Sequence, residues 1–297
     1  MSRDTSFYYS FLVLPPRKRR AVIAVWDFCR AVDDAVDEVV PGSDWRGGLS
    51  GEARARAAAQ LALWRAELGA CYADTTPQTS QGRALQPLIK DFNLPRTPFD
   101  ELIEGVAMDL DHARYPTFAA LEAYCRRVAS MVGLICVEIF GYEDPRTRSY
   151  AIDLGLALQI TNIVRDVAVD LRRGRVYLPV EDLERFGVTE EMLEEGRVTP
   201  AVRNLLRFEC ERARHYYRRA AAELPPVDAR NLVAAEIMGG IYFGILQRIE
   251  RAGYDVFSRR IRVPRPYRAL IALRIWCRTA LLSPKAQSPK PKAQRES

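Results

Sequence analysis

The sequence predicts an all-α protein. Ala, Leu, Arg and Glu, which favour helices, are abundant in long segments where Gly and Pro are rare. No long stretch alternates polar and apolar residues as a half-buried strand does, and no unit repeats along the chain. Hydrophobic residues make up 48% of the 297 residues, so the chain can bury a large core. We expect one helical domain over residues 1–282 and a disordered, basic, Pro-rich tail at 283–297.

The helices of the first half are separated by residues that break helices. Pro41-Gly42, Thr76-Pro77, Leu94-Pro95, Tyr115-Pro116 and Gly141 each follow a segment of helical composition. In chain order, they predict helices at residues 17–39, 51–72, 80–92, 98–113 and 117–140.

The second half is divided in the same way. Gly174, Pro225-Pro226 and Gly253 interrupt segments that otherwise read as helix. These breaks predict further helices at residues 145–171, 181–186, 199–223, 227–252 and 264–282.

Two acidic clusters lie inside apolar helical sequence, far apart along the chain. The first contains Asp33 and Asp37, which share a helix face because they are four residues apart. The second is a row of polar side chains on one helix face, made of Gln159, Asn162, Asp166 and Asp170. Burying an ionised carboxylate without a partner is costly, so we interpret both clusters as ligands of shared cations.

Magnesium fits these ligands best. Hard oxygen donors suit Mg²⁺, or Mn²⁺, better than Zn²⁺. Mg²⁺ usually takes one or two protein carboxylates and completes its shell with water and substrate phosphate. One D-x-x-x-D pair is more often a solvated helix face. Two such clusters, each near an arginine (Arg30 and Arg165), instead predict a site for a substrate that carries phosphate.

Cysteine and histidine usage excludes other kinds of site. The six cysteines form no C-x-x-C pair, so free thiols in a reducing cytoplasm are expected. The two histidines, His112 and His215, are too few for a His-based zinc site and lie near no nucleophile motif. Neither a signal peptide nor an apolar span of about 20 residues is visible, and we expect a cytoplasmic protein.

The net charge of +6 comes mainly from arginine clusters at residues 17–20, 172–175 and 259–262. No nucleic-acid-binding motif accompanies them, so no nucleic-acid partner is expected. With the basic residues of the tail, they predict weak, reversible contact with the anionic inner face of the cell membrane. A non-catalytic helical scaffold with basic membrane-binding ends is the alternative from a different functional class.

Several motifs follow one another along the chain, at residues 6–10, 29–37, 124–129, 159–166 and 175–179. Over about residues 6–264, the chain resembles the squalene/phytoene synthases, the head-to-head prenyl diphosphate condensing enzymes. Details at 11–16, 108–111 and 115–118 most resemble the bacterial presqualene diphosphate synthases of hopanoid pathways.

The resemblance implies an isoprenoid-synthase helical bundle with a central apolar cavity, whose mouth holds Mg²⁺ against two diphosphates. It implies these metal ligands: Asp33, Asp37, Asn162, Asp166 and Asp170. It also implies that Tyr124 is catalytic, and that substrate is bound by Ser6, Arg30, Gln159, Arg165 and Arg259. One departure is Ala168-Val169, where the family often has Gly-Glu; the ligand positions are intact.

Other roles stay open for four of these residues. Tyr124 could be a core tyrosine with a bonded hydroxyl, Arg165 a structural ion-pair partner, and Ser6 a helix cap. Arg260 or Arg262 could take the place assigned to Arg259.

The expected reaction is the condensation of two farnesyl diphosphates to presqualene diphosphate, with release of diphosphate, for squalene and hopanoid biosynthesis. Downstream pathway enzymes are further candidate partners. NADPH use is not expected, because the chain has no Gly-rich dinucleotide-binding fingerprint. Two alternatives within the family are a phytoene synthase acting on geranylgeranyl diphosphate and a squalene synthase. A terpene cyclase, with one substrate, would not need two similar diphosphate sites.

Overall fold

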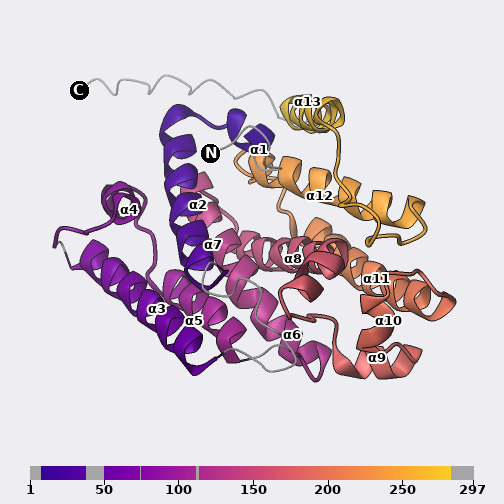
Figure 1. The fold of residues 1–297 in the computed structure, drawn as a ribbon. Helices are drawn as coiled ribbons and strands as arrows, with labels where there is room; N and C mark the ends of the chain where they lie inside the picture. The colour runs from indigo at the N-terminus through magenta and orange to yellow at the C-terminus, as the bar shows by residue number, and fades with distance from the viewer. Residues whose placement is uncertain (1–7, 38–49, 74, 112–113, 282–297) are drawn as a thin grey trace, which may run out of the picture.

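The computed structural model describes residues 8–37, 50–73, 75–111 and 114–281 (Figure 1). In these ranges every regular element is a helix, and the one pairing of strand type is an isolated bridge between Arg114 and Val176. The predicted all-α fold is confirmed. The proposed tail at 283–297 lies outside the described residues, so its separation from the domain stays a prediction.

The helices before the centre of the chain are α1 (Tyr8–Leu12), α2 (Pro16–Asp37), α3 (Gly51–Tyr72), α4 (Ser80–Phe92), α5 (Thr97–Asp111), α6 (Phe118–Cys125), the π-helical turn η2 (Arg126–Ser130) and α7 (Met131–Phe140). Those that follow are α8 (Arg146–Arg172), α9 (Val180–Phe186), α10 (Glu190–Glu194), α11 (Pro200–Glu223), α12 (Val233–Arg251) and α13 (Arg265–Leu281).

Most predicted helices agree with these bounds within one or two residues where the chain is described. The helix expected over 117–140 is interrupted by the π-helical turn η2, and the one expected from residue 227 begins at Val233. The short helices α1 and α10 were not predicted, because five residues are too few to show a 3.6-residue period. Threonine caps help to set the observed starts: the Thr79, Thr117 and Thr199 side chains accept the first free backbone N–H groups of α4, α6 and α11.

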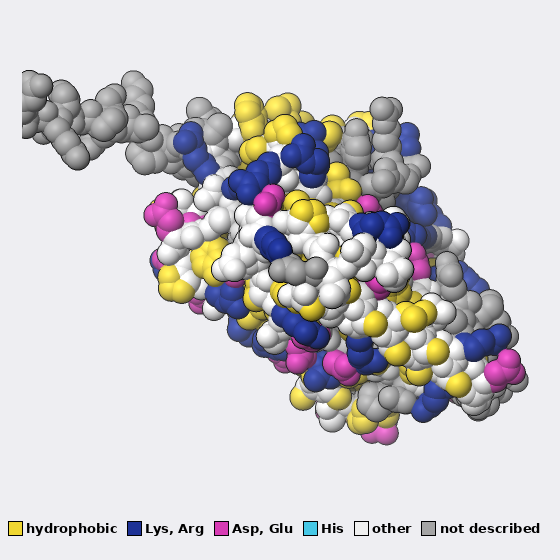
Figure 2. Space-filling model, turned by 90° about the vertical axis from the view of Figure 1, so that its left-hand side faces the viewer, with side chains coloured by type: hydrophobic (Ala, Val, Ile, Leu, Met, Phe, Trp, Pro, Cys, Tyr) yellow, Lys and Arg dark blue, Asp and Glu magenta, His cyan; other side chains and the backbone are white. Residues whose placement is uncertain are grey.

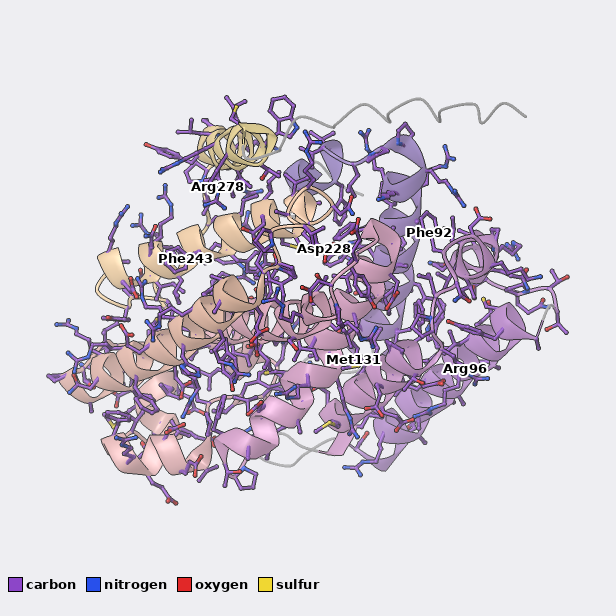
Figure 3. The ribbon with its side chains drawn as sticks, turned by 180° about the vertical axis from the view of Figure 1, so that it is seen from behind. Phe92, Arg96, Met131, Asp228, Phe243 and Arg278 are labelled. Atoms are coloured by element: carbon purple, nitrogen blue, oxygen red, sulfur yellow. The ribbon has the colours of Figure 1, made fainter. Side chains whose placement is uncertain are left out.

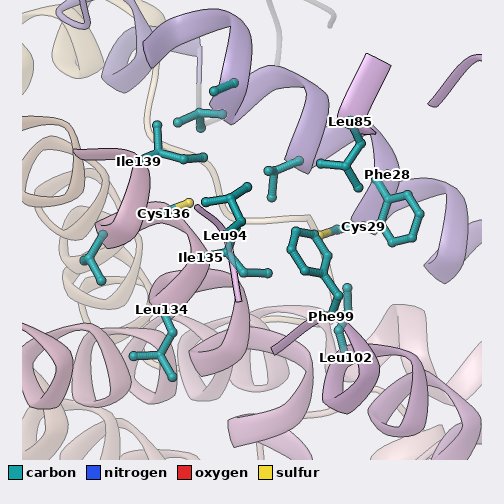
Figure 4. Close-up of a cluster of buried hydrophobic side chains, with 14 of the residues drawn as sticks. Phe28, Cys29, Leu85, Leu94, Phe99, Leu102, Leu134, Ile135, Cys136 and Ile139 are labelled. Carbon is teal, nitrogen blue, oxygen red and sulfur yellow. The ribbon is translucent and has the colours of Figure 1, made fainter. Parts of the chain in front are cut away.

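Helix α8 runs through the middle of the molecule, with α2 to α5 on one side and α11 to α13 on the other (Figure 1). It packs against α11, η2, α7, α12 and α6. Between α2, α5 and α7 lies a cluster of buried side chains that includes Phe28, Phe99, Leu102 and Ile135 (Figure 4). The interior is therefore helix packed on helix, and α8 has neighbours on several sides.

Glycines let α8 approach the segment that contains η2. A Cβ atom at Gly155 would lie 2.7 Å from Ser130 Cα, and one at Gly133 would lie 2.9 Å from the carbonyl oxygen of Ala151. The Ser130 hydroxyl also donates to the carbonyl oxygen of Ile152, at 2.8 Å. This close contact sets the position of the chain around Tyr124, which precedes η2.

The buried carboxylate of Asp228 holds the segment before α12 against the start of α8. Asp228, labelled in the rear view (Figure 3), is buried and accepts hydrogen bonds from the backbone N–H of Glu143 and Asp144 and from the Thr147 hydroxyl. These bonds explain why residues 227–232 form turns before α12 instead of extending it.

No helix in the described part of the chain has both the length and the apolar composition needed to cross a membrane.

Candidate functional site

A cavity of about 590 Å³ opens between α2, α5, α8 and α12. Along both α2 and α8, the lining changes from apolar to polar towards the C-terminal end. Trp26 and Cys29 precede the acidic residues of α2, and Leu154 and Leu158 precede those of α8. The cavity therefore has an apolar end and an end rich in carboxylates and arginines.

The first acidic cluster lies at the polar end, on the last turns of α2. Asp37 accepts hydrogen bonds from Arg173 Nη1 at 2.6 Å and from Arg175 Nη1 at 2.8 Å. Asp33, one turn earlier, also lines the cavity. The segment that follows α8 thus closes over the end of α2 through two arginines.

The second acidic cluster faces the same space from α8. Asp166 pairs with Arg165 and with Arg260, whose Nε and Nη2 atoms each lie 3.1 Å from a carboxylate oxygen. Asp170, Asn162 and Gln159 line the cavity on the same helix. The structure therefore brings together the two rows that the sequence separates by more than 120 residues.

Burial and like charge raise the pKa of two of these carboxyl groups. Burial, followed by repulsion from Asp37 and Asp109, raises the pKa of Asp33 to about 7. Burial, followed by repulsion from Asp166, raises the pKa of Asp170 to about 8. Burial by itself would raise the pKa of Asp166, but the hydrogen bonds and charges of Arg165 and Arg260 hold that pKa below its usual value.

The donor set suits a cation that shares its coordination with substrate. The Asn162 Oδ1 atom is buried and accepts no hydrogen bond from the described residues. No three His, Cys, Asp or Glu side chains in those residues converge tightly enough to hold a metal by themselves. An open set of carboxylates with one unsatisfied amide oxygen fits Mg²⁺ completed by water and phosphate. Metal binding by these residues stays a prediction.

Tyr124 belongs to a buried cluster at the polar end. Its hydroxyl donates to Asp109 Oδ2 at 3.1 Å, and the Tyr177 hydroxyl donates to Asp109 Oδ1 at 2.9 Å. The two phenol rings stack with centroids 5.3 Å apart, and Arg175 lies 3.8 Å from the Asp109 carboxylate. Burial, together with the charge of Asp109, raises the Tyr124 pKa well above its ordinary value, so this hydroxyl stays protonated.

The expected substrate-binding residues differ in their placement. Gln159, Arg165 and Arg30 line the cavity, where Arg30 pairs with Asp34 at 3.4 Å. Arg259 is exposed and does not line the cavity; its neighbour Arg260 occupies the place expected for it. Ser6 lies outside the described residues.

The sequence analysis assigned no place in the site to Asp109, Arg173, Arg175 or Tyr177; it gave the arginines of residues 172–175 only a role in membrane contact. Like the residues of the two predicted acidic clusters, Asp109 lies in an apolar helical stretch, here that of α5. It has no acidic residue three or four positions before or after it, so it did not form a recognisable cluster. Arg175 and Tyr177 follow α8 in an irregular segment held beside Arg114 by the Val176 bridge. Their position depends on that long-range pairing, so spacing could not reveal it.

Comparison with known proteins adds several relatives of similar length. The chain is 37% identical to the 15-cis-phytoene synthase of Synechocystis, over 93% of this chain and 82% of the relative. It is 38% identical to a phytoene synthase of Arthrospira platensis, over 87% of this chain and 84% of the relative. Among solved structures, a dehydrosqualene synthase matches with a TM-score of 0.80 and 28% identity over 94% of this chain and 93% of that one. The squalene synthase HpnC of Alicyclobacillus acidocaldarius matches with a TM-score of 0.69 and 33% identity, over 84% of this chain and 89% of that one.

These relatives correct one expectation. The presqualene diphosphate product predicted from residues 11–16, 108–111 and 115–118 is wrong, because the curated relatives that match most of the chain are phytoene synthases. Residues 11–16 join α1 to α2 at the end of α2 away from Asp33 and Asp37, and Asp109 is the one residue of the three motifs that lines the cavity. The motifs therefore carry little information about the apolar end of the cavity.

The wider resemblance is confirmed. The squalene/phytoene synthase family model matches residues 1–267, which is nearly all of the described chain and includes both acidic clusters. The protein therefore belongs to the squalene/phytoene synthase family.

Proposed function

We propose that this protein is a phytoene synthase, which joins two geranylgeranyl diphosphates head to head and releases two diphosphates and two protons. The observation that carries the proposal is 36–38% identity to phytoene synthases of Synechocystis, Synechococcus elongatus and Arthrospira platensis over at least 87% of this chain. No hydride is needed, since each half of the reaction ends in loss of a proton. The absence of a dinucleotide fingerprint from the sequence agrees with this chemistry.

The polar end of the cavity binds the diphosphates in this proposal. Asp33, Asp37, Asn162, Asp166 and Asp170 would hold Mg²⁺, which would neutralise the charge that develops on a departing diphosphate. Arg165, Arg173, Arg175 and Arg260 already lie beside these carboxylates, and their guanidinium groups suit phosphate oxygens.

The apolar end of the cavity receives the prenyl chains. Breaking an allylic carbon–oxygen bond leaves a carbocation that any nucleophile can trap, so water has to be kept out. Side chains such as Val132, Phe140 and Leu154 line this space and offer no lone pair to the cation. The second substrate's double bond is then the group that reaches the cation.

Tyr124 would act on charge near the diphosphates. Its single hydroxyl proton is donated to Asp109, so the groups that would stabilise a nearby cation are the oxygen lone pairs and the face of its ring. Released diphosphate, a stronger base than a protonated phenol, is the better acceptor for the protons that are lost.

Product analysis tests the proposal. Purified enzyme with Mg²⁺ would be given geranylgeranyl diphosphate or farnesyl diphosphate separately, without reductant, and the hydrocarbons identified by mass spectrometry. We expect a 40-carbon product, phytoene, from geranylgeranyl diphosphate. The Asp166→Ala variant, prepared identically, controls for enzymes carried over from the expression host.

A 30-carbon product is the second candidate, because two similar solved structures are a dehydrosqualene synthase and a squalene synthase. Turnover of farnesyl diphosphate with none of geranylgeranyl diphosphate would replace the proposed function by this one. Failure to release diphosphate from either substrate would leave the scaffold alternative.

A further inference from the structure

Helix α13 exposes an apolar surface that the catalytic site does not use. Leu270 and Leu273 are 60% and 57% exposed, and Tyr267 and Trp276 are 56% and 50% exposed. At about 100° per residue, the two leucines lie at the centre of the outer face of the helix, with one aromatic side chain at each flank. We call these four residues the α13 outer face.

The opposite face of α13 is already packed. Ala272, Ile271 and Ile275 lie against α12, where Gly240 and Gly244 make room for the isoleucine side chains. The Arg268 guanidinium is buried and donates to the carbonyl oxygen of Val263, at 2.7 Å. The helix is therefore anchored, and the outer face is a fixed surface of the folded protein.

The charged residues of α13 itself have one sign. The segment Arg265–Leu281 contains four arginines and no acidic residue. Arg274 is exposed, and Arg278 lies at the top of the molecule in the rear view (Figure 3), where its exposed side chain reaches Glu236 of α12. Figure 2 shows hydrophobic side chains gathered at this upper end of the molecule, with Lys and Arg side chains beside them.

We propose that the α13 outer face docks onto an anionic membrane surface. Leucines with flanking Trp and Tyr suit the boundary between headgroups and acyl chains, and arginines suit anionic headgroups. This proposal goes beyond the proposed reaction and does not depend on the prenyl chain length. It also differs from contact through the basic tail at 283–297, which lies outside the described residues.

Charge argues against two other occupants of this face. A second copy that paired through the same face would bring its own arginines against these, with no acidic residue on α13 to match them. Residues 283–297 carry four basic residues, one acidic residue and no bulky hydrophobic side chain, so they have neither the charge nor the apolar surface to cover it.

The position of α13 relates this surface to the cavity. Ala235, Met238 and Tyr242 of α12 line the cavity, whereas Ile237 and Ile241, together with Gly240, face α13. Two helices, α12 and α13, therefore separate the cavity from the proposed membrane surface. An oily product made inside would be formed about two helix diameters, roughly 20 Å, from the bilayer.

Vesicle sedimentation with the full-length protein tests the proposal. The matched pair is Leu273→Glu on α13 and Leu63→Glu on α3, because the two leucines are 57% and 58% exposed and both variants add the same charge. On vesicles containing phosphatidylglycerol, we expect Leu273→Glu to lower the partition coefficient by about tenfold or more, since burial of one leucine is lost. Leu63→Glu should stay within about twofold of the parent protein.

A second variant tests the charge component independently. Arg274→Gln should lower binding to phosphatidylglycerol vesicles at low salt and leave the weaker binding to phosphatidylcholine vesicles unchanged. Quenching of tryptophan fluorescence by brominated lipid should disappear in Trp276→Phe, which reports directly on contact between α13 and lipid.

Three outcomes would overturn the proposal. One is equal binding by the Leu273→Glu variant and the parent protein. Another is a lipid-free dimer that Leu273→Glu converts to monomer, which would assign the face to a second copy. The third is loss of all vesicle binding on deletion of residues 282–297 while Leu273→Glu still binds, which would assign the contact to the tail.

Discussion

At the scale of single residues, the carboxylates of the cavity divide into two groups. Asp37 and Asp166 are paired with arginines, whereas burial and neighbouring acids raise the pKa values of Asp33 and Asp170 to about 7 and about 8. A site that concentrates negative charge in this way favours a bound cation, because a cation offsets both the burial and the repulsion that raise these pKa values. In the proposed function, the arginines would bind the phosphate groups that accompany the cation.

Removing either paired carboxylate should stop turnover without unfolding the protein. We expect Asp37→Ala and Asp166→Ala to lower the rate of diphosphate release by at least about 100-fold at saturating Mg²⁺, because each removes a metal ligand that stabilises developing charge. Asp27→Ala is the matched control, since Asp27 lies on the exposed side of the same helix as Asp37. Near-normal activity in either cavity variant would remove these residues from the metal site.

Asp109 is the residue that orients Tyr124 and Tyr177. Asp109→Asn should lower kcat by about 10- to 100-fold, the usual cost of losing a partner that orients a site residue, with a smaller change in KM. Asp228→Asn is the control, because Asp228 is an equally buried carboxylate with three hydrogen bonds but lies away from the cavity. The control should lose thermal stability and keep its kcat. If both variants lost stability and neither lost kcat, Asp109 would be a structural residue only.

At the scale of elements, α8 and η2 are in close contact near the site. The π-helical turn places Val128 and Ala129 in the cavity lining directly after Tyr124, and Gly155 allows α8 to lie against its backbone. Such turns inside α-helices are frequent at functional sites because they shift the register of the side chains that follow. Here the shift occurs between Tyr124 and the apolar lining contributed by α7.

Two glycine substitutions separate this contact from ordinary helix propensity. Gly155→Ala should destabilise the protein by about 1–3 kcal/mol, since the new methyl group would overlap the Ser130 backbone. Gly69→Ala, in α3, meets nothing within 4 Å and should stabilise the protein by up to about 1 kcal/mol. Urea unfolding curves measure both. A stabilising Gly155→Ala would show that the two helices can separate at little cost.

At the scale of the whole molecule, burial controls the reactivity of the cysteines. All six are free thiols; Cys277 on α13 is partly exposed, and the other five are buried. Burial, helped by the charge of Glu67, raises the pKa of Cys71 to about 11, and burial raises that of Cys136 to about 12. A buried thiol that stays protonated is a poor nucleophile, so the folded protein should protect most of its cysteines.

A thiol-reactive chromophore such as Ellman's reagent checks this. We expect one thiol per chain to react within minutes in the native protein and six to react in denaturant. The Cys277→Ser variant should show no fast thiol and five in denaturant. Rapid reaction of several thiols in a protein that keeps its circular dichroism would mean that the core opens far more readily than this packing implies.

The sequence by itself determined the features that depend on local interactions. Helix-forming composition and the breakers at Thr76-Pro77, Leu94-Pro95 and Pro225-Pro226 were sufficient for the all-α fold and most helix bounds. The 3.6-residue period was sufficient to place Asp33 with Asp37, and Asn162 with Asp166 and Asp170, on shared faces that line one cavity. These inferences need only the geometry of one helix at a time.

Tertiary structure decided which distant residues meet. Asp109 binds Tyr177 across 68 residues, and Asp166 pairs with Arg260 instead of Arg259. In both cases the partner lies in an irregular segment, where no period relates residue number to direction and packing alone sets which side chain points inward. The exposure of the α13 outer face arises in the same way, since α12 covers only one side of that helix. Local backbone geometry repeats and can be read from spacing, whereas long-range contacts follow from how whole helices pack together.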